Sequence, residues 1–385
     1  MLLAVSTMVA LPARADEEAP NNLLTTETAA SDSVPVKKPW LKRMVDNLYE
    51  IVKDFDRTDS NYIMSQKYNY TVMMQGTHTY ERYTLRNSTA KQTVVLAPKP
   101  SMKLGPYVGW RWIFFGYQID LSHLKSDTKK EFDLSLYSSM VGIDMFSRKN
   151  TGGYSIKDAT QNGQDYYKRF SDVRFDGIEV GVKGFNLYYI FNHRKFSYPA
   201  AFNQTNVQKR SVGSWLMGIG YTHHTAKLDH ERLRKLIAEK TNNEMVLDST
   251  FNLSKLNYTD ASVSLGYAYN YVFAPRWLFA SSLSLAVGYK RTVSDTDTDN
   301  FWMRFTKFKF SNLNIDGVGR FGLVYNNMRW YAGGSAIFHT YNYNKSRVSI
   351  NSTFGSFNVY VGYNFGKRHR EKKKSPNLKP ESSNL

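Results

Sequence analysis

The sequence predicts an all-β fold: an antiparallel transmembrane β-barrel of about twelve strands, preceded by a short amphipathic helix. Apolar and polar side chains alternate with a period of two through most of residues 66–366. Several of the alternating segments are long enough to cross a bilayer at a tilt. Aromatic residues (27 Tyr, 23 Phe and 7 Trp among 385 residues) gather where these segments end.

The alternation is clearest in three segments, residues 261–271, 277–289 and 357–365. In the first, the odd positions carry Ala, Val, Leu and Tyr, whereas the even positions carry Ser, Gly, Ala and Asn. Successive side chains of a strand point to opposite faces. Each segment therefore has one apolar face and one small or polar face.

The strand pattern also predicts how the segments are connected. Short links at 274–276 and 326–327 alternate with long polar ones at 147–177 and 227–256, as in outer-membrane barrels. The second long link contains a predicted helix at 229–240, and residues 192–213 leave room for another strand pair, so ten to fourteen strands fit. The twelve predicted strands are residues 68–80, 91–97, 102–112, 115–124, 131–146, 178–191, 214–226, 257–272, 277–291, 304–325, 328–343 and 347–365.

A soluble β-sandwich shows the same alternation and is the alternative fold. A sandwich packs its apolar faces against each other and needs no aromatic crowding at strand ends. A membrane barrel turns its apolar face to lipid and carries aromatic girdles at both interfaces. The aromatic residues at strand ends favour the barrel; they are Trp110, Trp112, Trp215, Tyr271, Phe273, Trp277, Phe279, Trp330 and Tyr331.

Composition excludes several other classes of protein. Past the N-terminus no run of 18 or more apolar residues exists, and the mean hydropathy is −0.49, which excludes a helical membrane protein. The sequence has no Cys, and therefore no disulfide, thiolate metal site or cysteine nucleophile. The formal charge of +18 indicates anionic surroundings, which in an outer membrane are lipid phosphates rather than nucleic acid.

The N-terminal residues predict export. Residues 1–15 form a short apolar segment that ends in the small-x-small pattern of a signal-peptidase site, Ala13 and Ala15. No basic residue precedes the apolar segment, and a buried N-terminal strand is the alternative. Residues 16–39 form a flexible linker, and residues 40–56 have the apolar period of an amphipathic helix on the periplasmic side.

The C-terminal strand ends in Gly362, Tyr363 and Phe365, which resemble the signal that the barrel-assembly machinery of Gram-negative outer membranes reads. A basic polar tail follows at 367–385. The expected partners are this machinery and outer-membrane lipids, together with a protein bound through the long loops or the N-terminal helix. The expected location is the outer membrane of a Gram-negative cell.

The search for chemistry predicts no enzyme, no metal and no cofactor. His223 and His224 are adjacent on a strand and therefore point to opposite faces, so they make a poor metal site with His230 and its neighbours. Ser122 with His123, and Ser335 with His339, lack the spacing of a nucleophile and its base. The basic residues predicted to line the lumen are Arg111, Lys183, Arg320 and Arg329.

Three stretches resemble a family of uncharacterised Bacteroidota envelope proteins, the domain of unknown function DUF4421. They are residues 191–215 (FNHRKFSYPAAFNQTNVQKRSVGSW), 133–146 (DLSLYSSMVGIDMF) and 59–63 (DSNYI). The resemblance covers about residues 55–366. It implies an exported barrel and implies no activity.

The expected function is a narrow or gated pore, or a carrier for small solutes. A barrel of about twelve strands has a narrow lumen that loops can close. A non-conducting structural or interaction barrel is the alternative, and an outer-membrane lipid hydrolase is disfavoured because no nucleophile and base are correctly spaced.

Overall fold

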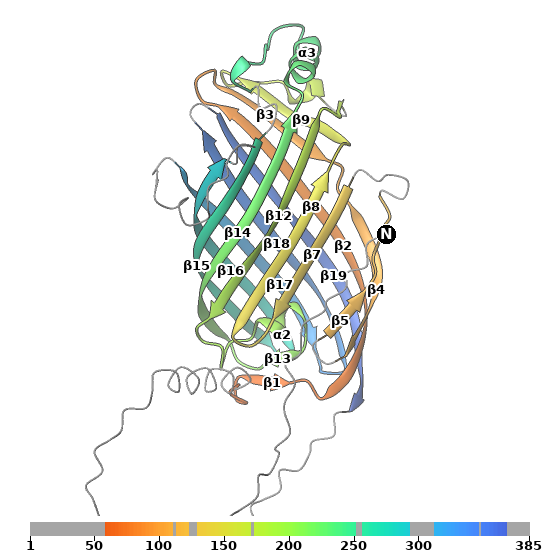
Figure 1. Cartoon of the computed structure of the whole chain (residues 1–385). Helices are drawn as coiled ribbons and strands as arrows, with labels where there is room; N and C mark the ends of the chain where they lie inside the picture. The colour runs from red at the N-terminus through yellow and green to blue at the C-terminus, as the bar shows by residue number, and fades with distance from the viewer. Residues whose placement is uncertain are drawn as a thin grey trace, which may run out of the picture.

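The computed structural model describes residues 58–110, 113–122, 129–170, 173–251, 256–292, 312–345 and 348–367 (Figure 1). The predicted signal peptide with Ala13 and Ala15, the linker 16–39, the helix 40–56 and all of the basic tail after residue 367 lie outside these residues, as does Arg111. Among the described residues, no helix has the length and apolar character needed to cross a membrane.

Long antiparallel strands make up most of the chain. Neighbours along the sheet follow the order β7, β8, β12, β14, β15, β16, β17, β18, β19, β2 and β4, and β4 also pairs with β5 and β6. The strands are β2 (Tyr68–Asn87), β4 (Met102–Trp110), β5 (Ile113–Gly116), β6 (Ile119–Asp120), β7 (Lys129–Tyr137), β8 (Val141–Asn150), β12 (Ile178–Ile190), β14 (Val212–Leu228), β15 (Leu256–Ala274), β16 (Trp277–Thr292), β17 (Leu313–Asn326), β18 (Trp330–Lys345) and β19 (Val348–Lys367).

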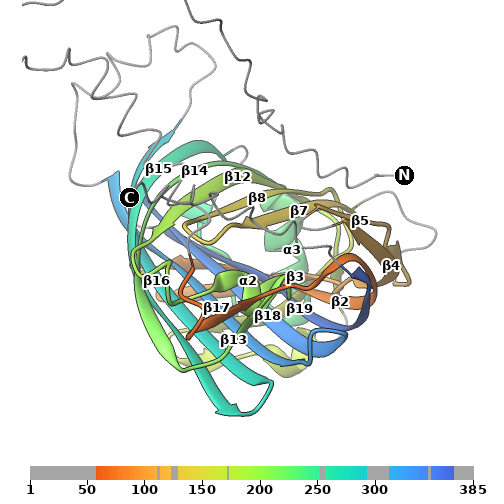
Figure 2. The ribbon, with the colours of Figure 1, turned by 90° about the horizontal axis from the view of Figure 1, so that it is seen from below.

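The sheet curls round into a barrel, as the two views show (Figures 1 and 2). The last strand, β19, pairs with the first long strand, β2, from Val348 opposite Asn87 to Lys367 opposite Tyr68. Between β5 or β6 and β7 no strand register exists among the described residues, and residues 123–128 lie outside them.

The alternation predicted from the sequence is confirmed. On β15 and β16 the apolar side chains at odd positions point outward; Leu265 is 58% exposed and Leu283 is 61% exposed. Their even-numbered neighbours point inward, where Asp260 and Asn270 are buried. The outer wall is therefore apolar and the interior is polar.

Two folded segments close the ends of the barrel. At the first, called the α3 end, β3 (Gln92–Pro98) pairs with β2 and β9 (Tyr154–Gln161), and the helix α3 (His230–Lys240) lies over them (Figure 1). At the opposite α2 end, the link between β12 and β14 carries the short helix α2 (Tyr198–Phe202) and β13 (Asn206–Gln208). The smaller elements are β1 (Ile63–Ser65), β10 (Gln164–Asp165), β11 (Arg174–Phe175), and the 3₁₀ helices η1 (Tyr167–Phe170) and η2 (Ser249–Phe251).

Four strand predictions need correction. The segment 91–97 is β3, which lies at the α3 end, because the upper part of β2 leaves β4 and pairs with β3. The segment 131–146 is two strands, since Ser138 closes a turn: its hydroxyl accepts a hydrogen bond from the Val141 amide at 2.9 Å. The predicted loop 147–177 holds β9, β10, η1 and β11, and the predicted strand 115–124 is interrupted between β5 and β6.

Two predictions about the links have different outcomes. The helix predicted at 229–240 is confirmed as α3, with Asp229 as its N-cap: the carboxylate accepts a hydrogen bond from the Arg232 amide at 3.0 Å. Residues 192–213, by contrast, contain α2 and the single short strand β13, which pairs with β1, rather than a strand pair of their own. Ser197 caps this helix by accepting from the Ala200 amide, and Pro199 in its first turn favours the helix.

Candidate functional site: the barrel interior and its two ends

An ion pair crosses the interior near the α2 end. The guanidinium of Arg320 on β17 contacts the carboxylate of Asp144 on β8. Ser135 and Tyr137 of β7 donate hydrogen bonds to the other oxygen of Asp144 at 2.7 and 3.1 Å. Arg320 also lies over the ring of Tyr188, with its Cζ 5.0 Å from the centroid. Arg320 and Asp144 are both buried, and the charge of each is balanced by the opposite charge of the other inside the barrel.

A second charged cluster joins β2, β4 and β7. The ammonium of Lys129 lies 2.8 Å from the carboxylate of Glu131 and 3.3 Å from that of Glu81. Lys103 approaches the other oxygen of Glu131 at 2.6 Å. These side chains therefore bridge β4 to β7 across the part of the wall that has no strand register.

A third cluster lies toward the α3 end on β15, β16 and β17. Lys290 donates to Asp316 at 2.9 Å and also contacts the carbonyl oxygen of Asn342. Asp260, on the neighbouring strand, is buried beside this pair. The positive charge of Lys290 is therefore balanced by carboxylates on the two adjacent strands.

Aromatic rings fill the interior between these clusters. His224 stacks on Tyr258 at 4.6 Å between ring centroids, and Tyr258 stacks on Tyr343 at 4.6 Å. Phe354 contacts His339 at 5.2 Å and Phe146 at 5.6 Å. Rings from β8, β14, β15, β18 and β19 thus meet in the barrel interior.

The α3 end is closed by an apolar core, which we call the cap. It is formed by β3, β9, η1, α3 and the segment that follows α3. Its fully buried members are Val94, Leu96, Tyr154, Ile156, Phe170, Phe175, Leu233, Ile237, Met245 and Phe251. Polar contacts join the parts of the cap, since Gln92 on β3 donates to the Val246 carbonyl at 2.8 Å and accepts from the Asp248 amide at 3.0 Å. Asn87 at the end of β2 donates to the Asp248 carboxylate at 3.3 Å and so ties the cap to the wall.

The α2 end is closed by residues 192–209, which we call the plug. The Tyr198 hydroxyl donates to Ser282 of β16 at 2.6 Å, and Gln204 donates to the Tyr360 hydroxyl of β19 at 2.6 Å. Asn270 of β15 donates to the Ser197 carbonyl at 2.9 Å. Three wall strands therefore hold the plug by hydrogen bonds, with apolar contacts from Phe196, Tyr198, Ala200 and Ala201.

The chain before β2 crosses under the plug. β1 pairs with β13, with Ile63 opposite Gln208, Met64 opposite Val207 and Ser65 opposite Asn206. The Asp59 amide donates to the Arg194 carbonyl at 2.8 Å. Residues 58–65, which we call the strap, hold the plug from the side away from the interior (Figure 2).

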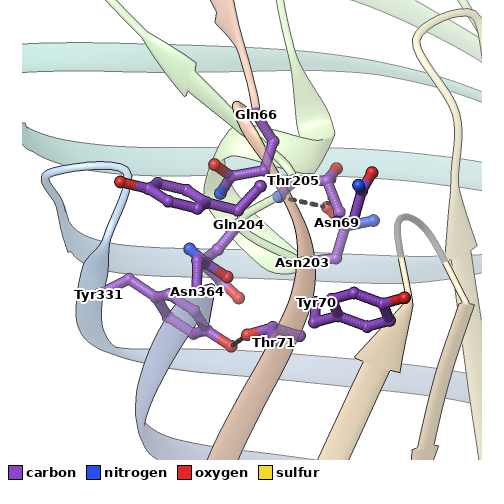
Figure 3. Close-up of a pocket in the computed structure, with 10 residues that line it drawn as sticks. Gln66, Asn69, Tyr70, Thr71, Asn203, Gln204, Thr205, Tyr331 and Asn364 are labelled. Carbon is purple, nitrogen blue, oxygen red and sulfur yellow. Dashed lines mark hydrogen bonds between the residues drawn. The ribbon is translucent and has the colours of Figure 1, made fainter. Parts of the chain in front are cut away.

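A small polar pocket lies where the plug meets β2 (Figure 3). The side chains of Thr71 and Tyr331 are hydrogen bonded at 2.8 Å on one side, and Asn203 accepts from Thr205 at 2.9 Å on the other. The cavity is about 10 Å³, and a second cavity of about 40 Å³ lies under the cap beside Tyr258. These volumes hold only one to a few water molecules.

The family of the chain follows from its sequence. Residues 57–365 match the family model described as "Domain of unknown function (DUF4421)". The chain belongs to the DUF4421 family. The resemblance found in three short stretches is thereby confirmed for the domain, which includes the plug, the cap and the whole of the wall.

Comparisons outside the DUF4421 family add little. No curated protein matches the chain. Among solved structures, the outer membrane protease OmpT from Escherichia coli is 7% identical with a TM-score of 0.34, covering 77% of this chain and 97% of its own. The translocator domain of the autotransporter NalP from Neisseria meningitidis is 8% identical with a TM-score of 0.26, covering 85% and 96%. The Pseudomonas putida toluene transporter TodX is 9% identical with a TM-score of 0.22, covering 78% and 91%.

These low scores give no information about what the DUF4421 domain does.

The lumen residues predicted from the sequence have different outcomes in this DUF4421 domain. Arg320 lines the interior as predicted. Lys183 is exposed on the outer side of β12, because the inward positions of that strand are the even ones. Arg329 is exposed in the turn between β17 and β18, where it donates to the Tyr363 hydroxyl at 2.7 and 2.9 Å. Both predictions are corrected.

Sequence reasoning missed the partners of Arg320. The signal was present, since Asp144, Asp260 and Asp316 are carboxylates at the inward positions of otherwise apolar strands. An isolated acid on such a strand requires a base on a neighbouring strand. Which base it meets depends on the register and curvature of the sheet.

The histidines and serines considered for chemistry lie apart. His224 is buried in the interior, and His230 is buried under the cap, where it contacts the Asp248 carbonyl at 3.1 Å. His339 and Ser335 both face the interior, so neither reaches the lipid edge. Within the described part of the chain, no three His, Asp or Glu residues are grouped to hold a metal ion.

Proposed function

We propose that this chain is an outer-membrane β-barrel that is closed as it stands, and that acts as a structural or interaction barrel rather than an open pore. One observation carries this: the interior is filled by ion pairs and stacked rings, and both ends are covered by folded segments. The two cavities described at the plug and under the cap are small, about 10 and 40 Å³, which agrees with it.

The outer surface supports a membrane location. Large apolar side chains cover the outside of the long strands at about half exposure, which would be unfavourable in water. Aromatic residues at the α2 end of these strands, including Trp215, Tyr271, Trp277 and Trp330, fit an interfacial girdle. Export by a signal peptide and insertion by the barrel-assembly machinery belong to the same proposal.

We further propose a closed barrel of about twelve spanning strands. The eleven neighbours from β7 round to β4 are followed by β5 and β6, which count as one interrupted strand. Three turns at the α2 end are short (138–140, 275–276 and 327–329), and the plug is the one long link described there. The long β8–β12 and β14–β15 links lie at the α3 end. Because outer-membrane barrels have short periplasmic turns, the α2 end is assigned to the periplasm.

Single-channel recording tests the closed state. The full chain in planar bilayers is expected to give no stepwise conductance, and a variant with residues 193–207 replaced by a Gly/Ser linker serves as its comparison. Stable steps from the unmodified chain, at any salt or voltage, would contradict the proposal.

A gated pore or carrier is the second candidate function, and the polar bonding of the plug favours it. The contacts of Tyr198, Gln204 and Asn270 with the wall are hydrogen bonds that water can replace. Conductance in the linker variant, with silence in the unmodified chain, would support gating. Silence in both would leave only the structural barrel.

Assembly and location have their own test. Phe365 stacks on Tyr70 of β2 at 5.5 Å, so the last residues of β19 also complete the junction with β2. Phe365→Asp is expected to leave the chain in the periplasm, whereas Phe365→Leu is expected to insert. Membrane fractionation and heat-modifiable migration on a gel report both, and normal insertion of Phe365→Asp would contradict this assignment.

The proposal includes no enzymatic activity. The nucleophile and base considered, Ser335 and His339, are inside the barrel, and Ser122 lies on an exposed turn. A screen with short-chain esters and phospholipids is expected to be negative. Hydrolysis that is lost in Ser335→Ala or His339→Ala would contradict this.

A further inference from the structure

The α2 end is strongly basic. Among its described residues Asp59 is the one carboxylate, and exposed Lys and Arg side chains outnumber it eight to one. These basic residues are Lys67, Arg194, Lys195, Lys209, Arg210, Arg276, Arg329 and Lys367. The cap carries mixed charge instead, with ion pairs such as Arg234–Glu231 and Arg169–Glu244. The excess positive charge is thus concentrated at one end.

Two sets of basic residues can be separated by position. Arg276, Arg329 and Lys367 lie on the rim, next to outward aromatic residues of the wall. Such residues suit the phosphates of the surrounding lipid. The other set, which we call the basic platform, is formed by Lys195 and Lys209 of the plug and by Arg210, which directly follows it.

The plug lies within the ring of wall strands when the barrel is viewed from the α2 end (Figure 2). The basic platform therefore faces the aqueous compartment, and the wall separates it from the lipid around the barrel. Lipid headgroups of the same membrane suit the rim better than the platform.

The backbone of the platform is firmly held although its side chains are exposed. Gln208 donates to the carbonyl oxygens of Lys195 and Arg210, at 2.7 and 3.2 Å. The Lys209 amide donates to the Tyr62 carbonyl at 2.7 Å, and its ammonium donates to the Ser60 carbonyl at 2.9 Å. The cations are therefore presented at fixed points and not on a loose loop.

Two of the cations lie against one aromatic ring. The Lys195 ammonium lies 5.2 Å from the centroid of the Tyr62 ring, and the Arg210 guanidinium lies 5.7 Å from it. Exposed single cations on a fixed backbone suit single negative charges repeated along a chain.

We infer that the basic platform binds a carboxylate-bearing polymer in the aqueous compartment that the α2 end faces. Fixed cations that have one carboxylate near them among the described residues repel one another, and an acidic polymer relieves this repulsion. The attraction is between exposed charges, so it weakens as salt rises. The inference concerns a binding surface, and it holds whether or not the barrel conducts.

Binding of fluorescent polyglutamate to the full chain in nanodiscs tests this inference. The variant K195Q/K209Q/R210Q is expected to bind about tenfold more weakly at low salt, as the loss of three exposed ion pairs implies. The control R232Q/K235Q/K240Q removes the same charge from α3 and is expected to bind as the unmodified chain does. The charge-conserving variant K195R/K209R/R210K is expected to bind normally, and heat-modifiable migration shows that each variant is folded.

Three outcomes would overturn the inference. The first is unchanged binding by K195Q/K209Q/R210Q, which would assign the affinity to the basic tail. The second is loss of binding in R276Q/R329Q/K367Q alone, together with binding to anionic vesicles, which would identify a headgroup surface. The third is binding of polyphosphate without polyglutamate. Conductance measured on the same preparations separates a failure of this inference from a failure of the proposed closed state.

Discussion

The two ends of the barrel are closed by different kinds of interaction. The cap at the α3 end is held by buried apolar side chains such as Phe170, Phe175 and Ile237. The plug at the α2 end combines two smaller apolar clusters with hydrogen bonds from Tyr198 and Gln204 to the wall. One end therefore resembles the core of a soluble domain, and the other is a smaller contact of mixed apolar and polar character.

The cap and the plug should therefore differ in the free energy needed to open them. Opening the cap exposes a whole apolar core to water, and the free energy required grows with the exposed area. Opening the plug exposes two apolar clusters that are smaller than the core of the cap. It also exchanges hydrogen bonds with protein for hydrogen bonds with water, and each of these contributes a net of only about 0.5–1.5 kcal/mol. We therefore expect the cap to stay folded under conditions in which the plug can move.

The largest effect is expected in the cap. Phe170→Ala removes a ring that is 1% exposed, and should lower the free energy of unfolding of the cap by about 3–5 kcal/mol. Denaturant titration followed by protease sensitivity of residues 147–177 measures it. Tyr167→Ala, on the same 3₁₀ helix but 51% exposed, is the control and should change it by less than about 0.5 kcal/mol. Equal effects would mean that the cap is not a packed core.

The strap allows the plug to be locked. Met64 and Val207 are opposite each other in the β1–β13 register, a distance that a disulfide spans. The chain has no Cys, so Met64→Cys with Val207→Cys forms the one disulfide available. Oxidation should stabilise the closed plug by about 2–4 kcal/mol, measured as protection of residues 192–209 from protease.

Reduction of the disulfide provides the control within the same sample. Protection should return to that of the unmodified chain, and each single Cys variant should show no response to oxidant. If oxidation leaves protease access unchanged, the plug opens without separating from the strap, and the strap is not part of the closure.

The wall was predictable because its alternation is local. In segments such as 261–271 and 357–365, the alternation of apolar and polar residues identifies the outward face and the inward face without any other part of the chain. The α3 helix was predictable for the same reason, since its cap residue Asp229 and its apolar period are neighbours in sequence.

The closures at the two ends could not be predicted because they depend on distant contacts. The segment 91–97 has the apolar and β-branched composition of a strand, and only its pairing with β9 places it in the cap. Tyr198 meets Ser282 across 84 residues, and Arg320 meets Asp144 across 176 residues. Such partners follow from barrel curvature and register, which a single sequence does not contain.

A smaller effect is expected in the plug. Tyr198→Phe removes the hydrogen bond to Ser282 and should weaken closure by about 0.5–1.5 kcal/mol, because the ring and its apolar contacts remain. Faster cleavage of residues 192–209 by protease measures this loss. Tyr167→Phe, which removes an exposed hydroxyl at the opposite end, is the control and should have no effect. A change as large as that of Phe170→Ala would remove the distinction between the two ends.

The smallest effect is the response of the cap to acid, because two of its carboxylates act in opposite directions. A hydrogen bond from Arg234 and the charge of Arg234 hold the pKa of Glu231 below its usual value of 4.5. The ionised Glu231 therefore stabilises the cap at pH values above 4.5, and this stabilisation is lost as the pH falls through the lowered pKa. Burial and the nearby Asp165 raise the pKa of Asp158 above its usual 3.8, so acidification relieves an unfavourable charge.

The cap should therefore change little in stability between about pH 7 and pH 4. Asp158→Asn should make the cap less stable on acidification, and Glu231→Gln should make it more stable, as denaturant titration at the two pH values measures. An acid response that is the same in both variants as in the unmodified chain would contradict the assignment to Asp158 and Glu231.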